Sequence, residues 1–107
     1  MTKIWLSYDL GIKGDYNGLY TYLDSVNATE CGNSVAYFET EIEKEIAKEI
    51  LLNLKSFCEI RKTDRLYLVM NKGTKTVSGF LLGKKQSPPW EGYYLGSNTD
   101  FDISKLL

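Results

Sequence analysis

Apolar and polar side chains alternate near the start of the chain, in the segment KIWLSYDL at positions 3–10. One side of this segment holds Ile4, Leu6, Tyr8 and Leu10, and the other holds Trp5, Ser7 and Asp9. A period of two is typical of a strand that buries one face. The pattern therefore predicts a strand that ends at a carboxylate and is broken by Gly11.

Two later stretches change to the helical period. Residues 16–26 place an apolar side chain every three or four positions, and Asp15 precedes them as a candidate N-cap. Residues 41–59, EIEKEIAKEILLNLKSFCE, repeat the pattern with Glu and Lys on the opposite side. We expect a helix in each stretch, the second with a solvated outer face.

The remaining apolar runs are short and read as strands. Residues 28–39 are expected to form two short strands around a turn at Gly32-Asn33. Residues 65–71 and 76–84 flank the turn NKGTK and predict an antiparallel hairpin. Residues 90–96, WEGYYLG, are expected to add an edge strand after the hairpin has ended at Pro88-Pro89.

This order predicts an α+β, ferredoxin-like βαββαβ two-layer sandwich with an extra C-terminal edge strand. Its antiparallel sheet would carry both helices on one face. If residues 28–39 formed a single strand, the order would be β-α-β-α-β-β instead. The length of 107 residues fits one domain, which we place at 1–96, followed by a C-terminal tail at 97–107.

The face opposite the helices has a consequence for assembly. Trp5 and Ser7 would point away from the core, and Phe38, Tyr67 and Val69 are candidates for the same face. An exposed apolar sheet face is typical of an interaction surface. We therefore expect a homodimer with Trp5 and Ser7 in its interface, which would bring Asp9 near its symmetry mate.

Composition narrows the chemistry. The chain has no histidine, which excludes the commonest general base and the commonest zinc ligand. Cys31 and Cys58 match no metal-ligand spacing, so two free thiols in a reducing cytoplasm are expected. No apolar run approaches the roughly 18 residues of a membrane span, and the N-terminus has no signal-peptide pattern. We expect a cytoplasmic protein that makes no use of a membrane.

The net charge of −1 hides a strong asymmetry along the chain. Residues 1–59 hold ten acids and five bases, and residues 60–107 hold four acids and eight bases. Between positions 61 and 85 the sole acid is Asp64, and the bases are Arg61, Lys62, Arg65, Lys72, Lys75, Lys84 and Lys85. Such a zone suits a phosphate backbone, although lysines also protect exposed strand edges and turns.

Several segments together resemble a known family. They are YDL at 8–10, GDYNGLYTYL at 14–23, GNSVAYFE at 32–39 and TDRLYLVMN at 63–71. In these the chain resembles the small ferredoxin-like CRISPR-associated proteins that partner the spacer-acquisition integrase. It also resembles their relatives, the virulence-associated protein D ribonucleases and the SinR-like proteins, of which the SinR-like branch is most similar. The resemblance runs in order through residues 3–71 and is weaker beyond residue 72.

The resemblance implies a homodimer and, in some members, metal-dependent cleavage of RNA or DNA. In those nucleases the aspartate at the end of the first strand, here Asp9, is the catalytic residue that holds a divalent metal with its mate across the dimer. Mg²⁺ or Mn²⁺ accepts oxygen ligands and lowers the pKa of bound water without a histidine. Asp9 has an alternative role as a turn residue whose carboxylate accepts from the amides of the glycine loop.

The sequence leaves three candidate functions. The first in rank is a non-catalytic, homodimeric module that binds RNA or DNA, or assists assembly, through the basic zone. The second is a divalent-metal-dependent nuclease that uses Asp9. The third is a toxin–antitoxin or regulatory component that binds protein alone, and added salt separates it from the first because phosphate contacts weaken steeply with salt.

Overall fold

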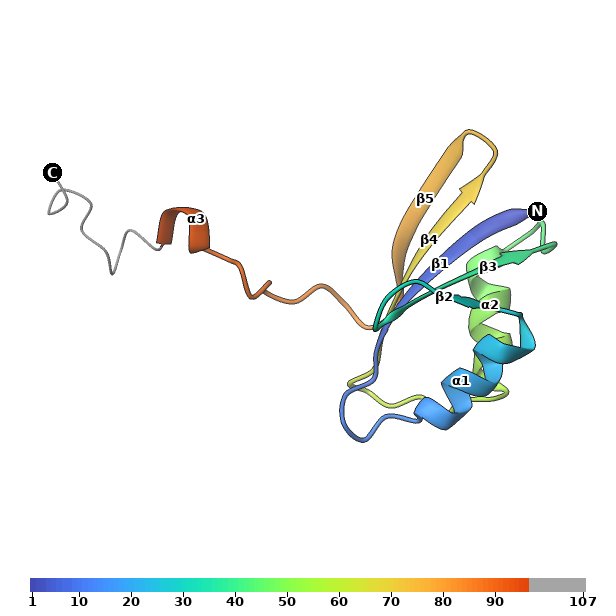
Figure 1. The fold of residues 1–107 in the computed structure, drawn as a ribbon, viewed down its shortest axis with the longest axis horizontal. Coiled ribbons are helices and arrows are strands. Elements are labelled where there is room, and N and C mark those ends of the chain that lie inside the picture. Colours follow the sequence, from blue (N-terminus) through green and yellow to red (C-terminus); the bar gives the residue numbers. More distant parts are fainter. Residues whose placement is uncertain (97–107) are drawn as a thin grey trace, which may run out of the picture.

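The computed structural model describes residues 1–96, and the tail expected at 97–107 lies outside the described residues. Within that range one antiparallel sheet forms one layer and two longer helices form the other (Figure 1). The strands are β1 (Thr2–Asp9), β2 (Thr29–Glu30), β3 (Val35–Thr40), β4 (Arg65–Lys72) and β5 (Lys75–Leu82). The helices are α1 (Tyr16–Ser25), α2 (Ile46–Lys55) and the short α3 (Tyr93–Gly96).

The sheet of residues 1–96 has the strand order β2-β3-β1-β4-β5, and all its pairings are antiparallel. β1 is central because it pairs with β3 on one side and with β4 on the other. Both α1 and α2 lie on the same face of the sheet (Figure 1). A small α+β fold with an antiparallel sheet and two helices is therefore confirmed, and it is compatible with a ferredoxin-like two-layer sandwich.

The core lies between the sheet and the helices. The apolar side of β1 is buried as the alternation predicts, with Ile4 and Leu6 fully buried and Tyr8 only 8% exposed. Leu19 and Tyr22 of α1 and Ile50 and Leu54 of α2 pack against it. The other side of β1, with Trp5, Ser7 and Asp9, faces away from the helices, as expected.

α1 begins where the sequence predicts. Asp15 is the N-cap, and its Oδ1 accepts a hydrogen bond from the Gly18 N–H at 3.0 Å. A carboxylate suits this position because the first N–H groups of a helix have no partner within the helix. Asp15 Oδ2 also accepts from the Glu59 N–H at 2.8 Å, so the same side chain ties the start of α1 to the end of the α2 segment.

The predicted hairpin of residues 28–39 is confirmed as β2 and β3. Gly32 lies in its turn at φ +131°, a conformation that favours glycine. The register pairs Phe38 with Ile4, and Phe38 is 3% exposed. Phe38 therefore belongs to the core, and its assignment to the Trp5 face was wrong. Its neighbours Tyr37 and Val35 take that face because side chains alternate along a strand.

The second helix is shorter than predicted from residues 41–59. α2 begins at Ile46, after Glu45 in the left-handed region at φ +48°. Residues 41–45 lead the chain from β3 to the helical layer, and the Ile42 N–H bonds to the Thr40 hydroxyl at 3.2 Å. The helix ends at Lys55, and residues 56–58 form a turn that places Cys58 in the core.

The edge strand expected at residues 90–96 does not form. The Glu91 N–H bonds to the Pro88 carbonyl at 3.0 Å, and the Tyr93 N–H bonds to the Trp90 carbonyl at 2.9 Å, so these residues form turns leading to α3. Proline has no N–H for a sheet, and Gly92 adopts φ +80°. The segment after β5 leads away from the sheet as an extended arm (Figure 1).

No helix formed by residues 1–96 combines the length and the apolar character needed to cross a membrane.

Candidate nucleic-acid interface

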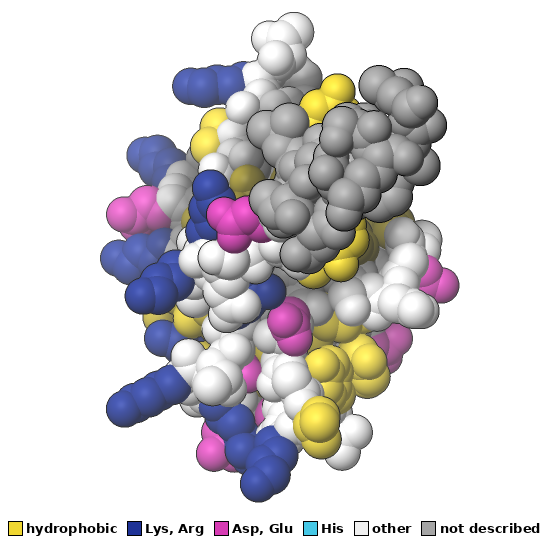
Figure 2. Space-filling model, turned by 90° about the vertical axis from the view of Figure 1, so that its left-hand side faces the viewer, with side chains coloured by type: hydrophobic (Ala, Val, Ile, Leu, Met, Phe, Trp, Pro, Cys, Tyr) yellow, Lys and Arg dark blue, Asp and Glu magenta, His cyan; other side chains and the backbone are white. Residues whose placement is uncertain are grey.

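The predicted basic residues lie in and around the β4–β5 hairpin, at its two ends. Lys72 and Lys75 face each other across the hairpin turn. Arg65 begins β4 at the opposite end, seven residues away, or about 23 Å at roughly 3.3 Å per residue. The others flank Arg65 in the chain segments before β4 and after β5: Arg61, Lys62, Lys84 and Lys85. Basic side chains gather along the left of Figure 2.

Asp64, the sole acid between residues 61 and 85, is buried. It is 1% exposed, and its Oδ2 accepts from the Arg61 N–H at 2.8 Å while its own N–H donates to the Arg61 carbonyl at 3.1 Å. These two bonds close the loop that carries Arg61 and Lys62. Its Oδ1 has no hydrogen-bond partner within the described part of the chain. The exposed charges of this segment are therefore all basic.

The open face of the sheet carries a band of aromatic side chains. Register places Tyr37, Trp5 and Val69 side by side on β3, β1 and β4. The rings of Trp5 and Tyr37 lie 5.1 Å apart between centroids. One row further along, Tyr67 pairs with Phe80 of β5, with ring centroids 5.0 Å apart. Val69 and Tyr67 thus share the Trp5 face, as expected.

Two hollows lie where this band meets the basic end of the hairpin. The smaller has a volume of about 170 Å³ and is lined by Ser7, Asp9, Arg65, Tyr67 and Phe80. The larger has a volume of about 590 Å³ and extends from Arg65 and Phe80 along the arm residues Lys85 to Trp90. Arg65 and Phe80 line both hollows. The structure thus brings Ser7, Asp9, Arg65 and Lys85 of the expected sites together.

The sequence pattern does not predict Phe80 at this place, and it predicts Pro88-Pro89-Trp90 either as a recognition element or as a group that ends the hairpin and packs on the sheet. Phe80 follows Thr76 and Ser78 at a period of two, which was the available signal that all three share one face of β5. Trp90 lies eight residues after the end of β5 and reaches the hollow through the path of residues 85–90. No alternation pattern marks such a path.

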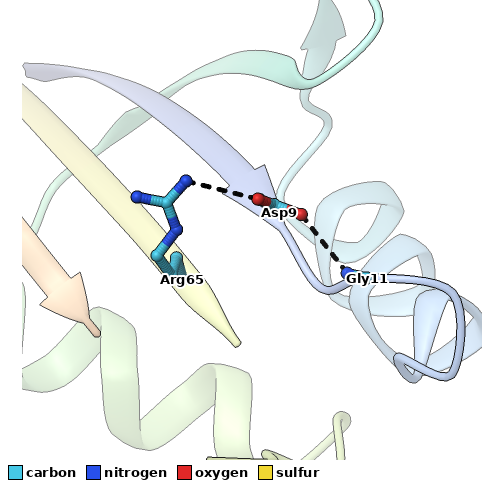
Figure 3. Close-up of polar contacts among 3 residues, drawn as sticks. All are labelled: Asp9, Gly11 and Arg65. Carbon is cyan, nitrogen blue, oxygen red and sulfur yellow. Dashed lines mark hydrogen bonds and ion pairs between the residues drawn. The ribbon is translucent and has the colours of Figure 1, made fainter. Parts of the chain in front are cut away.

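Asp9 makes two contacts within the chain (Figure 3). Its Oδ1 accepts from the Gly11 N–H at 3.3 Å, and its Oδ2 lies 3.4 Å from an Arg65 guanidinium nitrogen. Gly11 adopts φ +70°, so the turn that presents this N–H favours glycine. The expected turn bond is therefore present, together with an ion pair that the sequence did not predict.

Within a single chain, Asp9 does not make a complete site for a divalent cation. One chain supplies a single carboxylate there, its side chain is 63% exposed, and the positive charge beside it is that of Arg65. A hard cation needs several oxygen ligands and would have to displace the guanidinium. Nowhere in residues 1–96 do three or more Cys, Asp or Glu side chains group as potential metal ligands. A metal at Asp9 would need ligands from outside the described chain.

The two cysteines are free, and one of them is inert. Cys31 is exposed and Cys58 is buried. Burial, with the nearby Asp15 carboxylate, raises the pKa of the Cys58 thiol to about 11. The thiol is therefore protonated at neutral pH, which excludes Cys58 as a thiolate nucleophile.

Comparisons with known proteins return no relative: no family model, curated protein or solved structure matches the chain.

Proposed function

We propose that the protein is a small homodimeric module that binds RNA or DNA through the basic residues of positions 61–85. The observation that carries this proposal is the separation of charge in that segment. Seven bases lie there with one acid, and that acid, Asp64, is buried. Asp9 of β1 pairs with one of these bases, Arg65, and the excess of positive charge that remains attracts the phosphates of a nucleic acid.

In this proposal, both basic ends of the hairpin contact phosphates of the same nucleic acid. Lys72 and Lys75 at the turn and the group around Arg65 are about 23 Å apart along the strand, as seven steps of roughly 3.3 Å. An extended phosphate backbone is long enough to contact both. Contacts of this kind position a nucleic acid without reading its sequence.

The homodimer is part of the same proposal, with Trp5 and Ser7 in its interface. Its support is the aromatic band of the open face, where Tyr37 and Val69 flank Trp5. We also propose that the fold is the ferredoxin-like βαββαβ sandwich, with β5 added beside β4, and that the chain belongs with the CRISPR-associated small proteins and their relatives. The element order and the quoted sequence segments support this placement.

A salt titration tests the proposal. Binding of labelled single-stranded RNA, single-stranded DNA and duplex DNA is measured at increasing salt for the wild type and for the Lys84→Ala/Lys85→Ala double variant. Two lost phosphate contacts should weaken binding of every sequence similarly and lower the slope of log K against log salt by about 1.4 for single strands.

The matched control is Lys48→Ala/Lys55→Ala, which removes the same charge from α2 on the helical layer and should leave binding unchanged. If the two double variants bind alike, these lysines of the hairpin end are not a contact surface. If no nucleic acid binds at any salt concentration, the proposed function is wrong.

A further inference from the structure

The two hollows that share Arg65 and Phe80 form a continuous surface feature, which we call the Arg65 groove. It starts at Ser7 of β1, passes Tyr67 of β4 and Phe80 of β5, and ends at Trp90 of the arm. Its rings are accessible, because Tyr67 is 36%, Phe80 40% and Trp90 70% exposed. Large aromatic side chains exposed together beside a cation are unusual for a surface without a ligand.

The groove carries two cations and one carboxylate together with its aromatic rings. Arg65 lines both hollows and pairs with Asp9 in the smaller one, and Lys85 and Trp90 both line the larger one. Single-stranded nucleic acids are bound by this combination, in which bases stack on aromatic rings and phosphates contact basic side chains. A duplex offers its phosphates but keeps its bases stacked on each other, so the rings would gain nothing from it.

We propose that the Arg65 groove binds a single-stranded segment of RNA or DNA, with bases stacked on Phe80 and Trp90 and phosphates on Arg65 and Lys85. This rests on the proposed function and adds the class of nucleic acid and the place of its bases. The groove meets the proposed dimer interface at Ser7 and leads from there toward the arm, so Trp5, Tyr37 and Val69 stay available to a second copy.

A second copy of the chain is the other occupant to consider for the groove itself. A twofold interface centred on the groove would bring Arg65 and Lys85 of the two copies close to each other. Like charges facing each other at an interface are unfavourable. The two cations of the groove outnumber its one carboxylate, Asp9, so an anionic strand matches the excess charge better than a second groove does.

The test compares a mixed-sequence single strand with its duplex, in RNA and in DNA, by fluorescence anisotropy at one salt concentration. We expect the single strand to bind more tightly, and we expect Phe80→Leu and Trp90→Leu each to weaken it about tenfold. Both variants should leave duplex binding and the salt slope unchanged, because no cation is lost. The control is Phe57→Leu, which changes an exposed aromatic side chain beyond the end of α2.

A second readout avoids dependence on these variants. The chain has two tryptophans, so Trp5→Phe leaves Trp90 as the sole tryptophan emitter. Base stacking should quench its fluorescence as the single strand saturates the protein, and the duplex should not. Quenching by RNA and DNA alike assigns the groove to single strands in general, and quenching by one of them assigns it to that one.

Several results would overturn the proposal. One is Trp90 fluorescence that stays unquenched when the single strand saturates the protein. The others are equal affinity for duplex and single strand, and an unchanged affinity for the single strand in both Phe80→Leu and Trp90→Leu. If the ring variants instead convert the protein to a monomer in sedimentation velocity, the groove is an interface between copies. When duplex binding persists and still depends on Lys84 and Lys85, the proposed function stands and only the groove assignment fails.

Discussion

Asp9 and Asp15 are both carboxylates next to a glycine-containing turn, and their bonds give them different roles. Asp15 accepts two backbone N–H groups, from Gly18 at 3.0 Å and from Glu59 at 2.8 Å. These bonds stabilise the charged form, so the pKa of Asp15 is lowered from 3.8. Asp9 accepts one N–H and pairs with Arg65 at the surface. Asp15 therefore joins two elements, whereas Asp9 orders one turn.

This difference predicts a pH effect at Asp15. A carboxylate with a lowered folded-state pKa stabilises the protein above its unfolded pKa, and this stabilisation is lost as pH falls through the folded value. Asp15→Asn should therefore lower the melting temperature at pH 7, and the gap to wild type should narrow below about pH 4. Thermal unfolding of both proteins between pH 7 and pH 3 measures this gap in melting temperature. A gap that stays constant with pH, or one matched by Asp24→Asn on the same helix, would contradict this role.

Asp9→Asn tests the alternative nuclease function. The asparagine side chain has nearly the same shape as the aspartate side chain, and its oxygen can still accept from the Gly11 N–H. The free energy of unfolding should therefore change by about 1 kcal/mol or less. We expect neither wild type nor variant to cleave RNA or DNA with Mg²⁺ or Mn²⁺, because each chain supplies a single carboxylate there and that carboxylate is paired with Arg65. Cleavage by the wild type that is lost in a folded, dimeric variant would instead make Asp9 a metal ligand.

At the scale of elements, the local pattern of apolar residues predicted correctly those strands and helices that bury one face against the core. The alternation in β1 and the Asp15 cap of α1 are such cases, because burial and capping depend on neighbouring residues. The start of α2 was missed, since residues 41–45 have helical spacing but serve as the link from β3 to the helical layer. The place of Trp90 in the hollow lined by Phe80 was not predicted, because no local pattern determines the path of residues 85–90.

Gly18 lies inside α1, where glycine is unfavourable, and allows α1 to pack closely against the end of the α2 segment. A Cβ at this position would meet the Phe57 carbonyl and would lie 2.7 Å from Cys58 Cα, so α1 approaches the end of the α2 segment backbone to backbone. Alanine favours a helix over glycine by about 1 kcal/mol. Overpacking against a backbone that cannot move aside costs about 1–3 kcal/mol. Close packing, and not helix propensity, therefore explains the glycine.

We predict that Gly18→Ala destabilises the protein by about 1–2 kcal/mol in denaturant unfolding, as the balance of these two effects. Gly79→Ala is the control, because a Cβ there has no neighbour within 4 Å and β5 accepts an alanine. It should change stability by no more than about 0.5 kcal/mol. A Gly18→Ala variant as stable as wild type would mean that the two helices can separate freely.

At the scale of the molecule, the two layers carry different surfaces. The helical layer and the β2–β3 side hold most of the acids, and the β4–β5 side holds the basic segment. This separation of acidic and basic residues could be predicted by counting charged residues along the sequence. Its division into two groups follows from the predicted hairpin, because Lys72 and Lys75 lie in the NKGTK turn and Arg65 and Lys84 lie at the far ends of its two strands. The surface accordingly has a basic side along the β4–β5 segment and an apolar centre at Trp5.

The apolar centre carries the last prediction, that the chain is a homodimer at micromolar concentration. Trp5 packs on Tyr37 and is only partly covered within one chain, so a second sheet face would remove further apolar surface from water. Sedimentation should therefore give twice the 12.2 kDa of one chain. Trp5→Lys should shift the protein to monomer, since it places a charge in the interface.

Leu52→Lys is the matched control, because Leu52 is an equally apolar side chain, 52% exposed on α2, outside the proposed interface. It should sediment as the wild type does. If the wild type is a monomer at high concentration, or if both lysine variants dissociate alike, the open face is not the dimer interface. In the first case Trp5 and Tyr37 would become available to extend the base-stacking surface from Phe80 across β1 and β3.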